Sequence, residues 1–258
     1  MRGEVVLIDA TPVDPDALLA PGTDVFFYRR PAPETRVPYE IDTVFEDDNI
    51  MVVNKPPFLA TMPRGSHITE SVTVRLRRAT GNQELTPAHR LDRATSGLIL
   101  LTKRAELRGA YQELFARREV DKIYEAIADD IGLTAPLVWE HHIEKTEGEP
   151  SARILSEREP NALTHVSNIE PINDRPGAAR YLLHPVTGRT HQLRVQMLAA
   201  GIPIHGDPIY PRIHALDEED FAKPMLLSSV GLSFTDPLSG QKRRFTTPGF
   251  SGFPVPQP

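Results

Sequence analysis

The chain has 258 residues, of which 40% are hydrophobic and 25% charged, so it can bury a substantial core as one large domain or two small ones. It contains no cysteine, which excludes disulfides, thiolate metal ligands and a cysteine nucleophile. Its net charge of −6 would disfavour binding to nucleic acid, but the charge is unevenly distributed. Residues 1–50 hold 4 basic and 11 acidic side chains, a net −7, whereas residues 72–122 hold 11 basic and 6 acidic ones, a net +5.

Residues 1–40 predict an N-terminal extension rather than a domain. Two short apolar runs, Val5–Ile8 and Val25–Tyr28, are separated by acids and prolines, and the proline-rich segment 30–38 is typical of an extended connector. The early acids interrupt any signal-peptide core, and no apolar run reaches the roughly 18 residues that span a bilayer, so we expect a cytoplasmic protein. The main domain is expected over residues 41–258.

Residues 41–80 predict a hairpin followed by a helix. Strands are expected at Thr43–Glu46 and Ile50–Asn54, with an acidic turn between them. Lys55 and Pro56 end the hairpin, and Lys55 is expected to be structural first and a phosphate contact second. A short helix is expected at Glu70–Ala79, with its arginines in water.

The stretch TPAHRLDRATSGLILLTK, residues 86–103, sets one carboxylate among possible cations. Asp92 lies close to His89, Arg90 and Arg93, and a strand with the character of a buried one follows at Gly97–Lys103. A polar loop anchored by an apolar strand is a common way to hold a reacting group. The alternative is a loop acid that pairs with a neighbouring arginine or closes an Asx turn.

The next segments predict one amphipathic helix and a series of strands. The helix is expected at Arg104–Arg118 and a half-buried strand at Glu119–Ala128. Short antiparallel strands are expected around Leu137–Ile143, Ala152–Leu155 and Thr164–Ile169. The excess of basic residues over 72–122 fits either a phosphate-binding face or ordinary solvated helix surfaces.

The last segments predict a strand at Tyr181–Pro185, a helix within residues 187–200 and a strand pair, Met225–Phe234 with Gln241–Thr246. Gly201 follows the helix at the position that favours glycine. His191 and Arg194 stand three residues apart, which places both on one face if the helix includes them.

The string HRLDRATSG at residues 89–97 resembles the signature of the RluA-type RNA pseudouridine synthases. So do the Lys-x-Tyr-x-Ala segment at 122–126 and the string from Thr187 to Tyr210, and the resemblance covers about residues 41–246. Gln196 departs from it, since many relatives have histidine there, and no S4-type RNA-binding domain is recognisable. The resemblance implies an α/β fold of the α+β type, with a mixed, largely antiparallel sheet and flanking helices.

The resemblance also implies an activity and a set of site residues. Uridine in ribosomal or transfer RNA would become pseudouridine, an isomerisation that adds no atom and needs no cofactor or metal. Asp92 would be the nucleophile, Arg194 its cationic partner and Tyr124 the aromatic residue that packs on the uracil. Because the base must leave its stack, Arg90 is expected to fill the gap. Further substrate contacts are expected from His89, Arg93, Arg189 and His191, in a protein that acts as a monomer.

Two alternatives stay open. A metal-dependent hydrolase could use His191, His205 and Asp207, although no second cluster of carboxylates completes a coordination sphere. A non-catalytic RNA-binding protein could keep the fold and lose the reaction, although such a protein would be expected to have lost Asp92, Tyr124 or Arg194.

Overall fold

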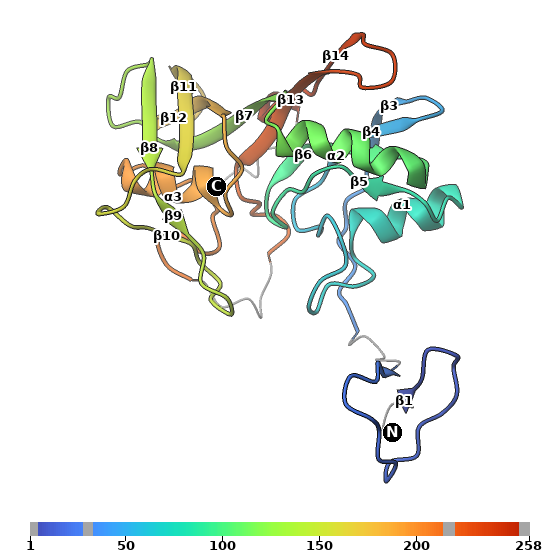
Figure 1. The fold of residues 1–258 in the computed structure, drawn as a ribbon. Coiled ribbons are helices and arrows are strands. Elements are labelled where there is room, and N and C mark those ends of the chain that lie inside the picture. Colours follow the sequence, from blue (N-terminus) through green and yellow to red (C-terminus); the bar gives the residue numbers. More distant parts are fainter. Residues whose placement is uncertain (1–4, 28–32, 214–219, 253–258) are drawn as a thin grey trace. The chain divides into compact units, whose positions relative to one another are not determined.

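The computed structural model describes residues 5–27, 33–213 and 220–252 (Figure 1). The chain divides into two compact units, Met1–Thr35 and Arg36–Pro258, and the division falls inside the connector predicted at residues 30–38. The N-terminal unit contains a two-stranded antiparallel sheet of β1 (Val5–Val6) and β2 (Phe26–Phe27). The C-terminal unit carries every predicted site residue.

One sheet dominates the described part of the C-terminal unit. Its strands run in the order β3-β4-β6-β13-β7-β12-β11-β8, with β14 paired to β13 and β5 paired to β6. All neighbours are antiparallel except β6 and β13, which are parallel, so the predicted mixed, largely antiparallel sheet is confirmed. The strands are β3 (Asp42–Glu46), β4 (Ile50–Lys55), β5 (Thr86–Pro87), β6 (Ser96–Thr102), β7 (Val120–Asp129), β8 (Leu137–His141), β11 (Ala162–Pro171), β12 (Ala178–Pro185), β13 (Leu227–Thr235) and β14 (Lys242–Thr246).

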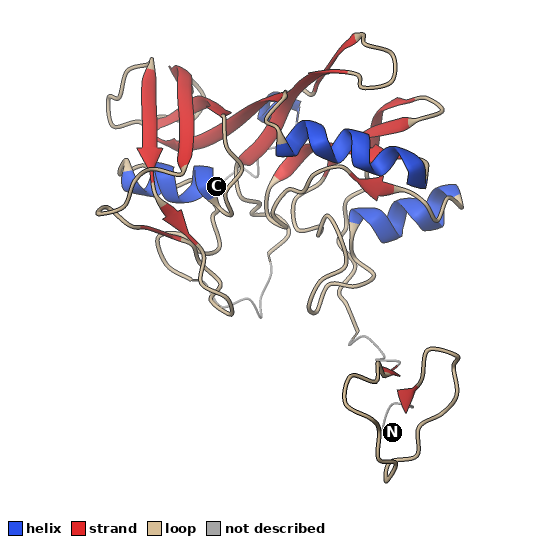
Figure 2. Cartoon of the chain, viewed as in Figure 1, coloured by secondary structure: helices blue, strands red, loops and turns tan. Residues whose placement is uncertain are grey.

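The helices flank this sheet (Figure 2). They are α1 (Val72–Thr80), α2 (Arg108–Ala116), which follows a 3-10 turn at Ala105–Leu107, and α3 (Gln192–Ala199); a further 3-10 turn lies at Gly249–Gly252. A separate short hairpin joins β9 (Ile143–Glu144) to β10 (Arg153–Ile154). No helix in the described ranges is long and apolar enough to cross a membrane.

Alternation along β4 and β6 explains how two helices pack near the site. Successive side chains of a strand point to opposite faces. Leu98 and Leu100 therefore pack with α2, in a cluster that includes Tyr111. Ile99 and Leu101 pack with α1 on the other face. The loop that carries Asp92 thus enters a strand held between two hydrophobic clusters.

The parallel seam between β6 and β13 depends on one glycine. Gly97 pairs with Ser229 across the seam and has a φ of 107°, in the region that favours glycine. A Cβ at this position would lie 2.3 Å from the carbonyl oxygen of Ser229, closer than atoms can approach. The seam therefore requires glycine directly after the Asp92 loop.

We expect Gly97→Ala to lower the free energy of unfolding by at least about 2 kcal/mol, because strain at positive φ adds to a backbone clash. Urea unfolding followed by circular dichroism measures the change. Gly109→Ala is the matched control: Gly109 lies inside α2 with no atom within 4 Å of the added Cβ, so stability should stay equal or rise slightly. Equal free energies of unfolding for the two variants would contradict the close contact of Gly97 with the Ser229 backbone.

Candidate active site

Asp92, Tyr124 and Arg194 line one pocket of about 110 Å³. Asp92 comes from the loop between β5 and β6, Tyr124 from the middle of β7, and Arg194 from the first turn of α3. The sheet order brings these elements together although they are far apart in the chain. The other residues of the lining are Arg90, Leu91, Thr95, Lys122, Pro185, Thr187, Gly188, Arg189, His191, Gln192, Leu193 and Leu227.

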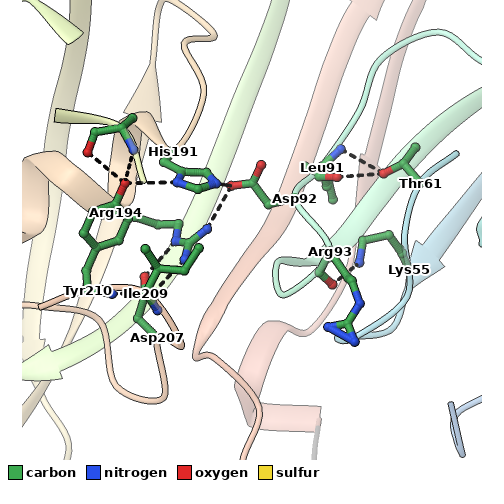
Figure 3. A network of polar contacts seen from close by, with 11 residues as sticks. Lys55, Thr61, Leu91, Asp92, Arg93, His191, Arg194, Asp207, Ile209 and Tyr210 are labelled. Atoms are coloured by element: carbon green, nitrogen blue, oxygen red, sulfur yellow. Dashed lines mark hydrogen bonds and ion pairs between the residues drawn. The ribbon is translucent and has the colours of Figure 1, made fainter. Parts of the chain in front are cut away.

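Hydrogen bonds fix the backbone on both sides of Asp92 (Figure 3). The Thr61 hydroxyl donates to the Leu91 carbonyl at 2.8 Å and accepts from the Leu91 N–H at 3.1 Å. The ammonium of Lys55 donates to the Arg93 carbonyl at 3.1 Å, and also to the carbonyls of Pro56 and Leu59. The Asp92 carboxylate therefore projects from a rigid loop, toward α3 and away from these anchors.

Lys55 is fully buried, which agrees with the structural role expected for it first. The pKa of Lys55 falls to about 7, chiefly because of burial; the carboxylate of Asp92 opposes this shift and the positive charge of Arg93 adds to it. Three carbonyl acceptors satisfy its three donors, as a buried ammonium requires.

Arg194 is held by a carboxylate that sequence reasoning did not assign to the site. Its Nε and Nη2 donate to the two oxygens of Asp207 at 2.7 and 2.6 Å, and both side chains are almost wholly buried. The third guanidinium nitrogen, Nη1, lies 3.4 Å from Oδ2 of Asp92. Burial lowers the pKa of Arg194, but Asp207 and Asp92 outweigh it, so the pKa lies above its usual value. A fixed positive charge thus faces Asp92.

Two further side chains complete the surroundings of this ion pair. The ring of Tyr210 lies 5.1 Å beneath the Arg194 guanidinium, and its hydroxyl is 3.0 Å from Nδ1 of His191. Nε2 of His191 lies 3.8 Å from Oδ2 of Asp92. Burial lowers the pKa of His191, although Asp92 opposes the shift. The neutral imidazole is therefore favoured beside the carboxylate.

The predicted start of the last helix needs one correction. Residues 187–191 form a loop and α3 begins only at Gln192, because His191 adopts a left-handed conformation with a φ of 56°. His191 therefore stands before the helix, not on its face, and reaches Asp92 from there. Gln196, the departure from the family pattern, is buried outside the pocket, where it accepts from the Thr164 hydroxyl and donates to the Trp139 carbonyl.

Tyr124 is a partly buried residue of the sheet that also faces the pocket. Burial raises the pKa of its hydroxyl, and the negative charge of Asp92 raises it further. The phenol therefore stays protonated at neutral pH. An apolar ring with a protonated hydroxyl, beside a carboxylate, can pack on a planar base and exchange a proton with it.

The remaining predicted contacts separate into two groups. Arg90 and Arg189 are exposed and line the pocket that holds Asp92. His89 and Arg93 do not line it. The His89 ring stacks on Phe115 with centroids 4.2 Å apart, and its Nε2 accepts a hydrogen bond from the Leu100 N–H at 3.2 Å.

His89 is expected to make stability depend on pH. Burial first and Lys122 second lower its pKa to about 3, below the 6.5 of an exposed histidine. The unfolded chain therefore binds more protons between pH 3 and 6.5, and stability falls as the pH falls through that window, by up to ~1.4 kcal/mol per pH unit.

Urea unfolding of wild type and His89→Gln at several pH values measures this contribution. Glutamine keeps an acceptor but does not titrate. As the pH falls from 6.5, the free energy of unfolding should therefore decrease more for the wild type than for the variant. A difference that stays constant with pH would contradict a buried neutral His89.

The geometry argues against the metal-dependent hydrolase. Both oxygens of Asp207 are engaged by Arg194, and Nε2 of His205 lies 2.8 Å from Asp129. Within residues 5–27, 33–213 and 220–252, no group of three or more histidine, cysteine or acidic side chains could hold a metal ion. Asp207 is a partner of Arg194 rather than a metal ligand.

Comparisons with known proteins agree on one family. The family described as RNA pseudouridylate synthase matches residues 49–199. The chain is 33% identical to the dual-specificity RNA pseudouridine synthase RluA of Haemophilus ducreyi over 80% of this chain and 92% of that protein. It is 31% identical to the ribosomal large subunit pseudouridine synthase D of Neisseria meningitidis over 94% of this chain and 68% of that protein.

A solved structure shows the same fold. The human RNA pseudouridylate synthase domain containing 1 superimposes with a TM-score of 0.66, at 23% identity, over 85% of this chain and 86% of that chain. The shared sheet, the matched segment and the identity to curated relatives point the same way: the chain belongs to the RluA-type RNA pseudouridine synthases.

Proposed function

We propose that this protein isomerises specific uridines to pseudouridine in ribosomal or transfer RNA, with Asp92 as the nucleophile. The observation that carries the proposal is the contact between a partly exposed carboxylate and a buried, permanently charged guanidinium, 3.4 Å apart in a pocket open to solvent. The ribosomal class is supported by the name of one relative, and the name of another calls it dual-specific without naming its RNAs. The transfer RNA class is carried over from the resemblance of the motifs. A cytoplasmic monomer would suffice for this activity.

For this reaction the protein must position the uridine and place charged groups beside the bond that breaks. The bond between C1′ and N1 of uridine breaks, the uracil rotates, and a bond forms between C5 and C1′. C5 then loses its proton, and N1, which carried the sugar before, gains one. A carboxylate can attack or stabilise the sugar carbon as the bond breaks, as in glycoside hydrolysis. The guanidinium of Arg194 lies 3.4 Å from Oδ2 of Asp92 and helps to hold the carboxylate in position.

Tyr124 and Arg90 supply the other two roles. The ring of Tyr124 packs on the uracil, and its protonated hydroxyl can take part in the late proton transfer. The target base must leave its stack to reach Asp92, and the exposed Arg90 at the same pocket is placed to fill the space behind it. Arg189 and His191 contact the substrate from the other wall.

The substrate is tested by offering the wild-type protein unmodified ribosomal RNA and unmodified transfer RNA separately. Pseudouridine is then mapped along each RNA. New pseudouridine at one or a few positions is the expected result, in one or both RNA classes. RNA binding without any new pseudouridine would instead support the non-catalytic RNA-binding protein.

A further inference from the structure

A second pocket lies directly beside the catalytic one, and the reaction does not use it. It has a volume of about 400 Å³, against about 110 Å³ for the pocket of Asp92, and the two share Arg90 and Leu91. Ligand sites commonly have volumes of roughly 300–1,000 Å³, so this space is large enough for a ligand of nucleotide size.

The walls of the second pocket are ordered. One wall is the loop that follows β4, residues 60–64 with His67, and the other is the segment 90–93. The reciprocal hydrogen bonds between Thr61 and Leu91 tie the two walls together. The backbones of Arg64 and His67 exchange hydrogen bonds of 2.9 and 3.0 Å around Gly65, which closes a tight turn. The pocket is thus built before any ligand arrives.

The segment 90–93 separates the two pockets. The Asp92 side chain points toward Arg194 and His191, while Leu91 and Arg93 make their backbone contacts on the opposite side with Thr61 and Lys55 (Figure 3). Arg90 lies at the boundary, since it lines both pockets. The two pockets are therefore close enough for one RNA strand to reach both.

The side chains that line the second pocket suit both the phosphate and the base of a nucleotide. Arg64 is an exposed guanidinium group, and such groups bind phosphate through paired hydrogen bonds. Met62 is 49% exposed, and with Pro63 and Leu91 it offers an apolar surface to the face of a base. Charge for the phosphate and apolar surface for the base thus lie in one pocket.

We propose that this second pocket, between residues 60–67 and 90–93, binds a nucleotide that flanks the target uridine in the same RNA strand. Arg64 holds its phosphate and Met62 packs on its unstacked base. The inference rests on the proposed function and deepens it, because it assigns a binding site to a second nucleotide of the substrate RNA.

The test uses a short synthetic RNA that contains the unmodified target uridine. A series of variants of this RNA carries an abasic site at each flanking position in turn. Steady-state rates of pseudouridine formation are measured for wild type, Met62→Ala and Arg64→Ala. Arg158→Ala is the control, since it removes the same charge from an exposed side chain on neither pocket. Thermal unfolding checks that each variant is folded.

Arg64→Ala should raise KM roughly tenfold with kcat within about twofold, and should reduce the slope of log KM against log salt by about one, as expected for one lost phosphate contact. Met62→Ala should form pseudouridine more slowly than the wild type on the intact RNA. At one flanking position, an abasic site should slow the wild type by the same factor. The same abasic site should not slow Met62→Ala any further. Arg158→Ala should match the wild type.

Three results would overturn the inference. Arg64→Ala and Met62→Ala that both match Arg158→Ala would show that the pocket holds no part of the substrate. Equal sensitivity of wild type and Met62→Ala to every abasic position would show that no flanking base contacts it. If the wild type forms no pseudouridine in any RNA, the proposed function is wrong and the inference fails with it. This result can be told apart from the first two, because they require an active wild type.

Discussion

Asp92→Asn should abolish pseudouridine formation, with a loss of at least roughly a thousandfold, while the fold and RNA binding remain. Asparagine has the size of aspartate but neither its charge nor its nucleophilic oxygen. Arg194 keeps both hydrogen bonds to Asp207, so the substitution leaves no buried charge without a partner. Rates are measured at saturating RNA, and RNA affinity by filter binding.

The control for this prediction is Asp47→Asn. Asp47 caps the turn between β3 and β4 and lines neither pocket, so its loss of charge should leave the rate within about twofold. A preparation of Asp92→Asn that retains more than roughly a hundredth of the wild-type rate would remove Asp92 from the role of nucleophile.

Asp207→Ala should be the most destabilising of the site substitutions, with a loss of about 3–5 kcal/mol in the free energy of unfolding. The reason is that it leaves the guanidinium of Arg194 buried with its main partner gone. The side chain of Arg194 is 3% exposed, so water cannot replace the carboxylate. Asp207 also accepts hydrogen bonds from the N–H groups of Ile209 and Tyr210, which shape the loop beneath Arg194. Urea unfolding measures the loss.

A double variant separates stability from chemistry. Arg194→Met together with Asp207→Asn removes the buried pair of charges and keeps an acceptor oxygen for the two N–H groups. It should recover much of the stability lost in Asp207→Ala, because replacing a buried ion pair costs far less than breaking it. Pseudouridine formation should remain absent, since Asp92 then lacks its cationic partner. An active double variant would show that Arg194 serves stability alone.

Most of the fold could be predicted from local patterns. The apolar runs of β4 and β6, the acidic turn between β3 and β4, and the amphipathic stripe of α2 each specify an element within the chain's own sequence. The sheet order could not be predicted in this way. The parallel pairing of β6 with β13 joins Ser96 to Ser228, 132 residues later, and depends on the absent Cβ of Gly97.

The site was predictable only where a residue carries its own chemistry. The motifs single out Asp92, Tyr124 and Arg194, and the sheet brings them to one pocket. In the sequence His89 is equivalent to Arg90, but its ring packs on Phe115. The sequence offers Asp207 only as a metal ligand; its role follows from the structure, because a buried arginine needs a buried acid.

The role of Asp92 in converting uridine can be tested on RNA itself. Pseudouridine is quantified site by site in unmodified ribosomal and transfer RNA after incubation with wild type and, in parallel, with Asp92→Asn. We expect new pseudouridine at defined positions with the wild type and none at those positions with the variant, which still binds the RNA. The same positions modified by both proteins would contradict it.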